Sequence, residues 1–396
     1  MNRLKTSWLN ADMSRRKNSL GIKPPEKQLK YMRKFWLNKK KIIKFILLIF
    51  VVWQVVLFIV GFCSSKFIAP KKQFMYNDGK DFSNPVWLWH RANFDGVHYL
   101  QISRNVYGLY QQEFFPLYPK LIKSLRPLFG KMDLVAGVFI SGVSSLLFFY
   151  LFYKLILIDF KENVAQKTLL SFIVFPASFY LGCVYTESLF VALTLGSFYF
   201  ARKKKWLFAG ILGALSSYCR IAGIFLFPAL ILEWYEQRSE EKRKKNWRSL
   251  LSIFLIPLMF WRVQPCFGAG RSGGKIILLY QVFWRYLKMI LTTKADLLYF
   301  NVWMELLTAV IFLILLFIAF RKNIRKSYLL FSSISFLVPT LTGTFLSLPR
   351  FALTMFPCFI VLGMIKNKLL YSLMLVVFAL LLLISSGLFF NGYWVS

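Results

Sequence analysis

Residues 369–390 read LLYSLMLVVFALLLLISSGLFF, a run of 22 positions without a charged side chain. A helix needs about 20 mainly apolar residues to cross the roughly 30 Å hydrocarbon core of a bilayer. Residues 42–62, 133–158 and 301–320 are also apolar and contain almost no charge. These runs predict transmembrane helices and hence a chain that crosses a membrane several times.

The overall composition supports a membrane protein. Of the 396 residues, 57% are hydrophobic and 17% are charged, whereas soluble chains carry about 25% charged residues. A chain of this length could hold two or three soluble domains. The long apolar runs favour one membrane domain instead, because lipid covers the surface that a soluble protein would have to bury.

The formal net charge of +35 first suggests nucleic-acid binding, but its distribution argues against that. Residues 1–41 hold thirteen Lys and Arg against two acidic residues, and short basic clusters at Arg202–Lys205, Arg238–Arg248 and Arg321–Lys326 separate apolar runs. This is the positive-inside pattern of cytoplasmic loops. We expect a basic cytoplasmic arm, a single transmembrane domain over 42–396, contacts with membrane lipids and no nucleic-acid partner.

With the basic clusters inside, the pattern predicts an all-α polytopic protein of about 11 transmembrane helices. Residues 63–132 form a long first external loop, 263–299 a second external or interfacial stretch, and the C-terminus lies outside. In residues 206–235 a re-entrant pair would satisfy the charges as well as two short spans. The expected spans are 42–62, 133–158, 168–185, 188–201, 206–219, 221–235, 249–262, 300–320, 327–346, 351–365 and 369–390.

The external residues 89–100, WHRANFDGVHYL, bring Asp95, His98 and the other histidine, His90, within nine positions. Asp95 and His98 are three residues apart, so on a helix they share one face. A carboxylate held there can act as a general base toward a hydroxyl. The plainer alternative is a solvated loop aspartate that caps a helix.

Three further charged residues stand at predicted external turns. Glu187 lies at the tip of the tight hairpin between 168–185 and 188–201, where it is either exposed or engaged with a partner. Arg220 and Arg350 lie between apolar runs. Arginine forms forked hydrogen bonds to phosphate and keeps its charge when partly buried, although simple extension of the side chain toward headgroups explains each arginine equally well.

Three other features of the sequence provide no candidate catalytic residue. In EFFPLYPKLIKSL (113–125), two prolines exclude a regular span and suggest a short helix at the outer membrane surface. The stretch GAGRSGGK (268–275) departs from a phosphate-binding loop at Ala269 and Ile276 and is rejected as one. The five cysteines show neither disulfide nor zinc spacing, and no metal-ligand set is expected.

Five motifs in order resemble the PIG-V family of membrane mannosyltransferases, which have the GT-C glycosyltransferase fold. They are FDGVHYL (94–100), FFPLYP (114–119), YTESLF (185–190), CRIAGIFLFPAL (219–230) and LPRFALTMFP (348–357). The resemblance implies a hexose donor, mannose in this family, linked to a polyprenyl phosphate. Residues 260–300 do not resemble the family's usual passage.

Matched position by position, the resemblance implies that Asp95 activates the acceptor and that His98 and Glu187 complete the catalytic set. It assigns Arg220 and Arg350 to the donor phosphate. No cofactor is implied, and the need for a divalent metal stays open. The acceptor would be a lipid, glycan or protein on the external or lumenal face.

Because a lipid phosphate leaves as a stable anion, a base and nearby cations suffice for a single displacement with inversion. Two other function classes stay open. A polytopic transporter or lipid flippase would share the spans, with charges along a path near the midplane, and a non-catalytic subunit would use the basic loops for docking. The expected location is the plasma membrane in a prokaryote or the endoplasmic reticulum in a eukaryote.

Overall fold

The computed structural model describes residues 26–71, 86–108, 111–241, 248–263, 276–294 and 296–395. The chain divides into two units, Met1–Ile49 and Phe50–Ser396. In the first unit the described part is helical and belongs to α2 (Glu26–Cys63), which ends in the second unit. The stretch at 268–275 lies outside the described residues. The site residues all belong to the second unit.

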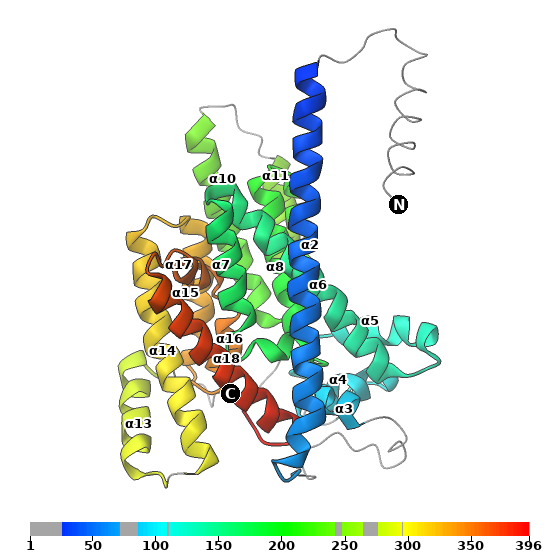
Figure 1. Ribbon diagram of the computed structural model, residues 1–396, viewed down its shortest axis with the longest axis vertical. Helices are drawn as coiled ribbons and strands as arrows, with labels where there is room; N and C mark the ends of the chain where they lie inside the picture. Colours follow the sequence, from blue (N-terminus) through cyan, green and yellow to red (C-terminus); the bar gives the residue numbers. More distant parts are fainter. Residues whose placement is uncertain are drawn as a thin grey trace. The chain divides into compact units, whose positions relative to one another are not determined.

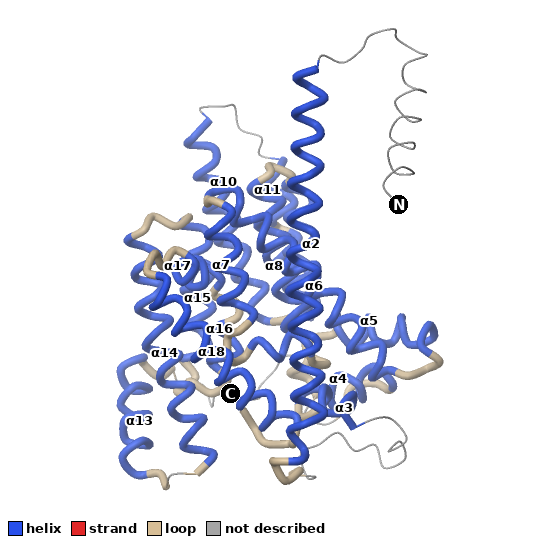
Figure 2. The backbone as a smooth tube through the Cα atoms, viewed as in Figure 1, coloured by secondary structure: helices blue, strands red, loops and turns tan. Residues whose placement is uncertain are grey.

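The fold is all-helical, as predicted, and no strand occurs in the part of the chain that the structure describes (Figure 2). The α-helices after α2 are α3 (Val86–Trp89), α4 (Asp95–Arg104), α5 (Leu117–Leu125), α6 (Asp133–Asp159), α7 (Glu162–Ile173), α8 (Glu187–Arg202), α9 (Trp206–Cys219), α10 (Leu226–Glu241), α11 (Arg248–Ile253), α12 (Leu255–Val263), α13 (Leu279–Thr292), α14 (Leu297–Arg321), α15 (Lys326–Thr340), α16 (Leu348–Ala352), α17 (Phe356–Gly363) and α18 (Lys368–Phe390). Short 3₁₀ helices are η1 (Ser64–Lys66), η3 (His90–Ala92), η4 (Arg126–Phe129), η5 (Ser178–Gly182) and η6 (Ile221–Phe225).

Four helices in the described ranges are long and apolar enough to cross a membrane: Lys40–Lys66, Asp133–Asp159, Tyr299–Arg321 and Lys368–Phe390. With 23 to 27 residues each and a rise of about 1.5 Å per residue, each exceeds the thickness of the hydrocarbon core. They coincide with the four apolar runs from which the membrane prediction started. The other described helices have 16 residues or fewer, so length and composition do not establish eleven spans.

The predicted third span, 168–185, is wrong as a continuous helix. Helix α7 ends at Ile173, and the chain then runs without α-helix to Thr186, with only η5 inside. Pro176 explains the break, because proline lacks an N–H and clashes with the preceding turn. The segment is buried almost throughout, and such irregular backbone is tolerated in a membrane protein where protein covers it.

The predicted spans 327–346 and 351–365 are also interrupted. Helix α15 stops at Thr340, beside Pro339, and α16 and α17 follow as separate helices of 5 and 8 residues with proline in their first turns. The span at 249–262 is divided in the same way into α11 and α12. Short, broken helices therefore replace these three predicted spans as well as 168–185.

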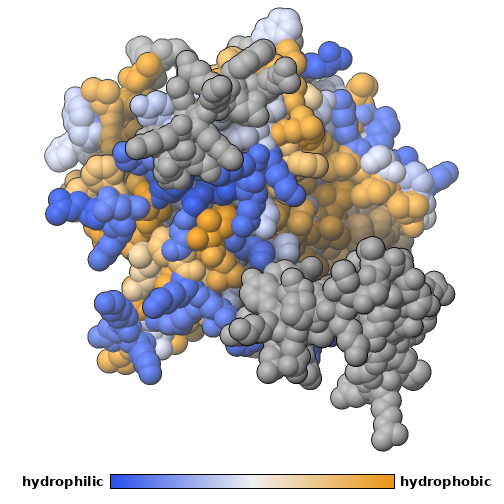
Figure 3. Space-filling model, turned by 90° about the horizontal axis from the view of Figure 1, so that it is seen from above, coloured by the Kyte–Doolittle hydropathy of each residue, from blue (hydrophilic) through white to orange (hydrophobic). Residues whose placement is uncertain are grey.

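Aromatic side chains fill the centre of the second unit, where α6 packs on α8 and α7 packs on α17. Phe148 and Phe172 lie 4.7 Å apart, and Phe172 and Phe359 lie 4.5 Å apart, measured between ring centroids. All three rings are fully buried. Viewed from above, patches of hydrophilic residues alternate with hydrophobic ones (Figure 3), as expected where helix ends and loops gather.

The first predicted external loop contains α3, η3, α4, α5 and η4. Helices α4 and α5 pack together, and α5 also packs on α6 (Figure 1). The predicted short helix within 113–125 is present as α5. Tyr118 anchors it, because its hydroxyl donates to the Gly137 carbonyl of α6 at 2.9 Å. This packing fixes α4, whose first residue is Asp95.

Candidate active site

The turn that presents Asp95 is held from three sides. Phe94 precedes it with a φ of 56°, a left-handed conformation that costs energy in a non-glycine residue. Its ring packs on Phe389 and Trp394, at 5.6 and 5.3 Å between centroids. The hydroxyl of Tyr185 accepts a hydrogen bond from the Asp95 amide at 3.2 Å and donates one to the Asn93 carbonyl at 3.0 Å.

The broken segment after α7 positions the next carboxylate. The Val184 amide donates to the Arg91 carbonyl at 2.7 Å, which ties the segment to the turn before α4. Gly96 allows this approach, since a Cβ there would lie 3.3 Å from the Val184 carbonyl oxygen. Two residues after Tyr185, Glu187 begins α8 with only 3% of its surface exposed.

Two arginines reach the same place from other helices. Arg220 follows the last residue of α9 in an extended conformation, and the chain turns back at Gly223, where a Cβ would lie 2.3 Å from the Ser217 amide nitrogen. Arg350 sits on α16, which starts after Ser347 in the left-handed region at φ 61°. Both guanidinium groups point to Glu187.

The four groups form one charged chain, termed here the Asp95–Arg220 chain. Arg350 Nη1 donates to Asp95 Oδ2 at 2.7 Å, and Arg350 Nε lies 3.2 Å from Glu187 Oε1. Arg220 Nη1 donates to that same Glu187 oxygen and to Thr186 Oγ1, the latter at 3.3 Å. With two carboxylates and two guanidinium groups, the four side chains of the Asp95–Arg220 chain have no net charge.

Exposure is greatest at Asp95 and least at Glu187, which lies between the two arginines. The Asp95 side chain is 27% exposed, those of Arg220 and Arg350 are 15% and 12% exposed, and that of Glu187 is 3% exposed. The second Glu187 oxygen, Oε2, is buried and has no hydrogen-bond partner among the described residues. Asp95 is therefore the more accessible of the two carboxylates, and Glu187 is buried.

Aromatic rings enclose the two guanidinium groups. Arg350 lies over the rings of Tyr180, Tyr185 and Phe351 at 5.5, 5.6 and 5.7 Å, and Arg220 lies 5.7 Å from Phe351. Cations are stabilised over ring faces at these distances. Burial alone would lower the pKa of Arg350, but the carboxylates of Asp95 and Glu187 outweigh it and hold that pKa above its ordinary value.

His98 is placed apart from this chain. It lies one turn beyond Asp95 on α4, where its Nδ1 is 3.4 Å from Gln111 Nε2. Its ring stacks on Phe114 at 4.9 Å. The structure thus joins Asp95, Glu187, Arg220 and Arg350 and gives His98 other partners. Asp95 does not cap α4 through its side chain either, because its carboxylate contacts Arg350.

Several residues around the site were not singled out from the sequence. Tyr180 and Tyr185 lie against Arg350. The one feature of the sequence that could have indicated Tyr185 is its place as the first residue of the YTESLF motif. Glu305, in the predicted span 300–320, is buried; its carboxylate accepts from the Tyr286 hydroxyl and, at 3.4 Å, from the Ser347 amide. This contact steadies the turn that leads into α16.

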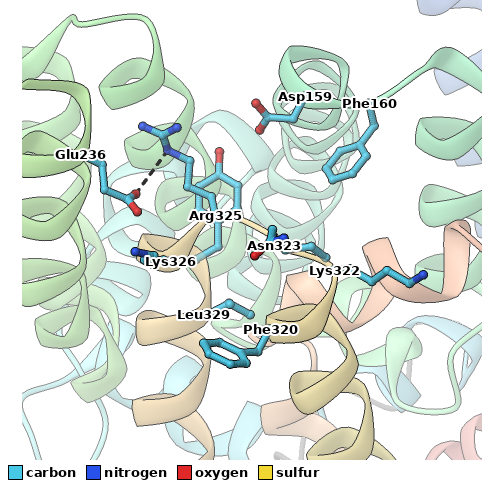
Figure 4. Close-up of a pocket in the computed structure, with 11 residues that line it drawn as sticks. Asp159, Phe160, Glu236, Phe320, Lys322, Asn323, Arg325, Lys326 and Leu329 are labelled. Atoms are coloured by element: carbon cyan, nitrogen blue, oxygen red, sulfur yellow. Dashed lines mark ion pairs between the residues drawn. The ribbon is translucent and has the colours of Figure 1, made fainter. Parts of the chain in front are cut away.

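A second charged cluster occupies the opposite end of α8. Arg202 forms two hydrogen bonds to Asp159, at 2.6 and 2.7 Å, and Glu233 accepts from Arg325 at 2.8 Å and from Ser327 at 2.6 Å. Beside it lies a cavity of about 340 Å³. In Figure 4 Arg325 points to Glu236, while Asp159 and Phe160 lie across the cavity from Leu329. Fifteen residues of helix separate this end from Glu187, about 22 Å, so the cavity is not part of the Asp95 site.

The family model for Mannosyltransferase (PIG-V) matches residues 34–264, more than half of the chain. The chain belongs to the PIG-V mannosyltransferase family. No curated protein matches it. Four of the predicted site residues lie in the matched range and Arg350 lies beyond it, but in the structure Arg350 contacts two of those four. Family membership and the apolar helices indicate an integral membrane protein that acts in mannosyl transfer.

For a PIG-V family member this arrangement has clear chemical capacities. Asp95 is an accessible carboxylate of fixed orientation that can accept a proton from a hydroxyl. Each arginine has five N–H donors, more than the carboxylates occupy, so each can also donate to an oxygen of a bound substrate. In the described ranges no group of three or more His, Cys, Asp or Glu is placed to hold a metal ion.

Proposed function

We propose that the protein transfers mannose from a polyprenyl-phosphate donor to a hydroxyl of a lipid, glycan or protein acceptor on the external or lumenal face. Family membership supports mannosyl transfer in a membrane. The single observation that carries the finer proposal is the pairing of Asp95 with Arg350, next to buried Glu187 and Arg220. It leaves one accessible carboxylate among hydrogen-bond donors.

The reaction is a single displacement with inversion. The acceptor oxygen bonds to the anomeric carbon while the bond from that carbon to the phosphate oxygen breaks. The hydroxyl proton passes to Asp95, and polyprenyl phosphate departs with the bonding electrons. Arg350 orients Asp95, and the free N–H groups of Arg350 and Arg220 donate to the departing phosphate. Glu187 keeps the two arginines side by side, and His98 orients the acceptor.

The proposed topology places these residues outside. The broken helices fit a GT-C-like architecture of about eleven crossings, some of them interrupted, with the basic clusters in the cytoplasm. The enzyme would act in the plasma membrane of a prokaryote or in the endoplasmic reticulum of a eukaryote. A transporter is the weaker alternative, since the charges form separate clusters at the two ends of α8 with no charged residue of α8 between them.

The decisive experiment uses membranes that contain the full-length protein and radiolabelled polyprenyl-phosphate mannose. The proposal requires incorporation of label by wild type and its loss in Asp95→Asn. The matched control is Asp296→Asn, because Asp296 is an exposed helix cap and asparagine caps equally well. No incorporation by wild type with any acceptor extract, or equal incorporation by Asp95→Asn, would reject the assignment.

A further inference from the structure

The charge of the donor raises a question that the Asp95–Arg220 chain does not answer. A sugar linked to a polyprenyl phosphate carries one negative charge, and the departing phosphate gains another. Both arginines of the chain are already neutralised by carboxylates. They can supply hydrogen bonds, but the set has no surplus positive charge. A nearby cation without a carboxylate partner would supply that charge.

Lys120 is such a cation. It lies on α5, within the FFPLYP-K segment, and its side chain is exposed. Its Nζ donates to the hydroxyl of Tyr218 and lies 5.1 Å from the centre of that ring. Tyr218 is neutral and precedes Arg220 by two residues at the end of α9. The Tyr218 contact thus holds the positive charge of Lys120, which no carboxylate among the described residues neutralises, next to the C-terminal end of α9, where Arg220 follows.

The surroundings of Lys120 reinforce its charge. Lys123 lies one turn further on the same face of α5, and Arg126 follows at the start of η4. Within the described residues none of the three contacts a carboxylate, whereas the nearby Arg104 is paired with Asp133. The other face of α5 is apolar and packs inward through Tyr118 and Ile122. Helix α5 thus shows a basic face to the outside and an apolar face to the protein.

We propose that Lys120, held by Tyr218 and assisted by Lys123, is the binding site for the phosphate of the polyprenyl-phosphate donor and of the polyprenyl phosphate that departs. This rests on the proposed function and adds a residue outside the Asp95–Arg220 chain. Lysine suits the task as a compact point charge. The Tyr218 contact limits its conformations, so less entropy is lost on binding than with a freely moving lysine.

The test measures binding of two probes to the purified full-length protein in nanodiscs of neutral phospholipid: undecaprenyl phosphate, and undecaprenol, which lacks the phosphate. For wild type we expect at least tenfold tighter binding of the phosphate form. Lys120→Met should reduce that preference by about tenfold and leave undecaprenol unchanged. Tyr218→Phe keeps the cation and should retain most of the preference. Lys288→Met, an exposed lysine of α13, is the matched control and should behave as wild type.

The outcomes separate the two proposals. If wild type does not prefer undecaprenyl phosphate to undecaprenol, the donor class itself is wrong and the proposed function fails. If wild type has the preference and Lys120→Met keeps it, only the assignment of Lys120 fails. Competitors distinguish the phosphate source: inorganic phosphate or phosphatidylglycerol that displaces the probe equally well would show a general anion contact and overturn the proposal. Lys120→Gln, which also removes the charge but stays polar, provides the same comparison if Lys120→Met does not fold.

Discussion

The guanidinium of Arg350 lies 2.7 Å from the carboxylate of Asp95, although 255 positions of sequence separate the two residues. One comes from the first predicted external loop and the other from a short helix near the end of the chain. Arg350 also reaches Glu187, so the contact joins three separate motifs at one point. The predictions below start from that junction.

Asp95→Asn should reduce mannosyl transfer about 10² to 10⁴-fold, the usual contribution of a general base. The amide keeps the size of the side chain and can still contact Arg350, but it cannot accept the proton. Initial rates at saturating donor measure the effect, and donor KM should change little. If Asp95→Asn failed to accumulate in the membrane, the side chain would have a structural role instead.

Arg350→Lys should lower turnover about 10 to 100-fold with donor KM within about threefold of wild type. Lysine keeps the charge but cannot contact Asp95 and Glu187 together, so the Asp95 carboxylate loses its orientation, and small misplacements of this kind cost up to about a hundredfold. Separate kcat and KM values provide the check. A tenfold rise in donor KM with unchanged turnover would show that Arg350 binds the donor before reaction and does not orient Asp95. Arg104→Lys, in a pair outside the site, is the control.

Glu187→Gln should destabilise the protein by about 3–5 kcal/mol, because it removes the carboxylate between two largely buried guanidinium groups and leaves Asp95, which contacts Arg350 alone, as their one counter-charge. Thermal unfolding in detergent measures the change. Glu162→Gln removes an exposed carboxylate at the start of α7 and should shift the free energy of unfolding by less than about 0.5 kcal/mol. Equal melting temperatures for the two variants would contradict the prediction.

His90 should make stability depend on pH. Burial lowers its pKa from 6.5 to about 4 in the folded protein, so between these values the unfolded chain binds more protons. The free energy of unfolding should therefore fall as pH is lowered from 6.5 to 4, by at most about 3 kcal/mol, and this contribution is complete above pH 6.5. Melting temperatures at pH 7 and pH 5 test this. His90→Phe should flatten the dependence, and an unchanged slope would exclude His90 as its source.

Labelling of single cysteines should establish the orientation. In a variant without native cysteines, Ser124→Cys in α5 should react with an impermeant reagent added outside. Asn323→Cys, in the basic turn between α14 and α15, should react only after permeabilisation, because Lys- and Arg-rich turns stay in the cytoplasm. Both positions are exposed, so access to the reagent is limited by the membrane alone. The reverse pattern would invert the topology.

The sequence predicted the long helices well and the broken ones poorly. Uniform apolar runs such as 369–390 have one stable form in a bilayer, and α18 follows that run closely. Residues 168–185 are nearly as apolar, but Pro176 ends the helix and the rest of the segment is stabilised by contacts with Arg91 and Asn93, remote in sequence. Hydropathy alone does not predict contacts between residues that are remote in sequence.

For the site, residue type indicated the charges but not their pairing. Asp95, Glu187, Arg220 and Arg350 were found because charges are rare beside apolar runs. Arg350 pairs with Asp95 because contacts of Glu305 with Tyr286 and Ser347 fix the turn before α16. Hydrophobic periodicity cannot predict such packing. His98 was grouped with Asp95 from its three-residue spacing, yet Gln111 and Phe114 draw it to another part of the loop.

The separation of Asp95 from Arg350 also sets a timetable for biosynthesis. At about 5–20 residues per second, the ribosome needs roughly 13 to 50 s to make the chain between them. Glu187 and Arg220, 33 positions apart, can pair about halfway through that interval, while Asp95 still lacks its partner. A chain that stops before α16 lacks Arg350, so its Asp95 carboxylate has no guanidinium partner and Glu187 retains Arg220 alone.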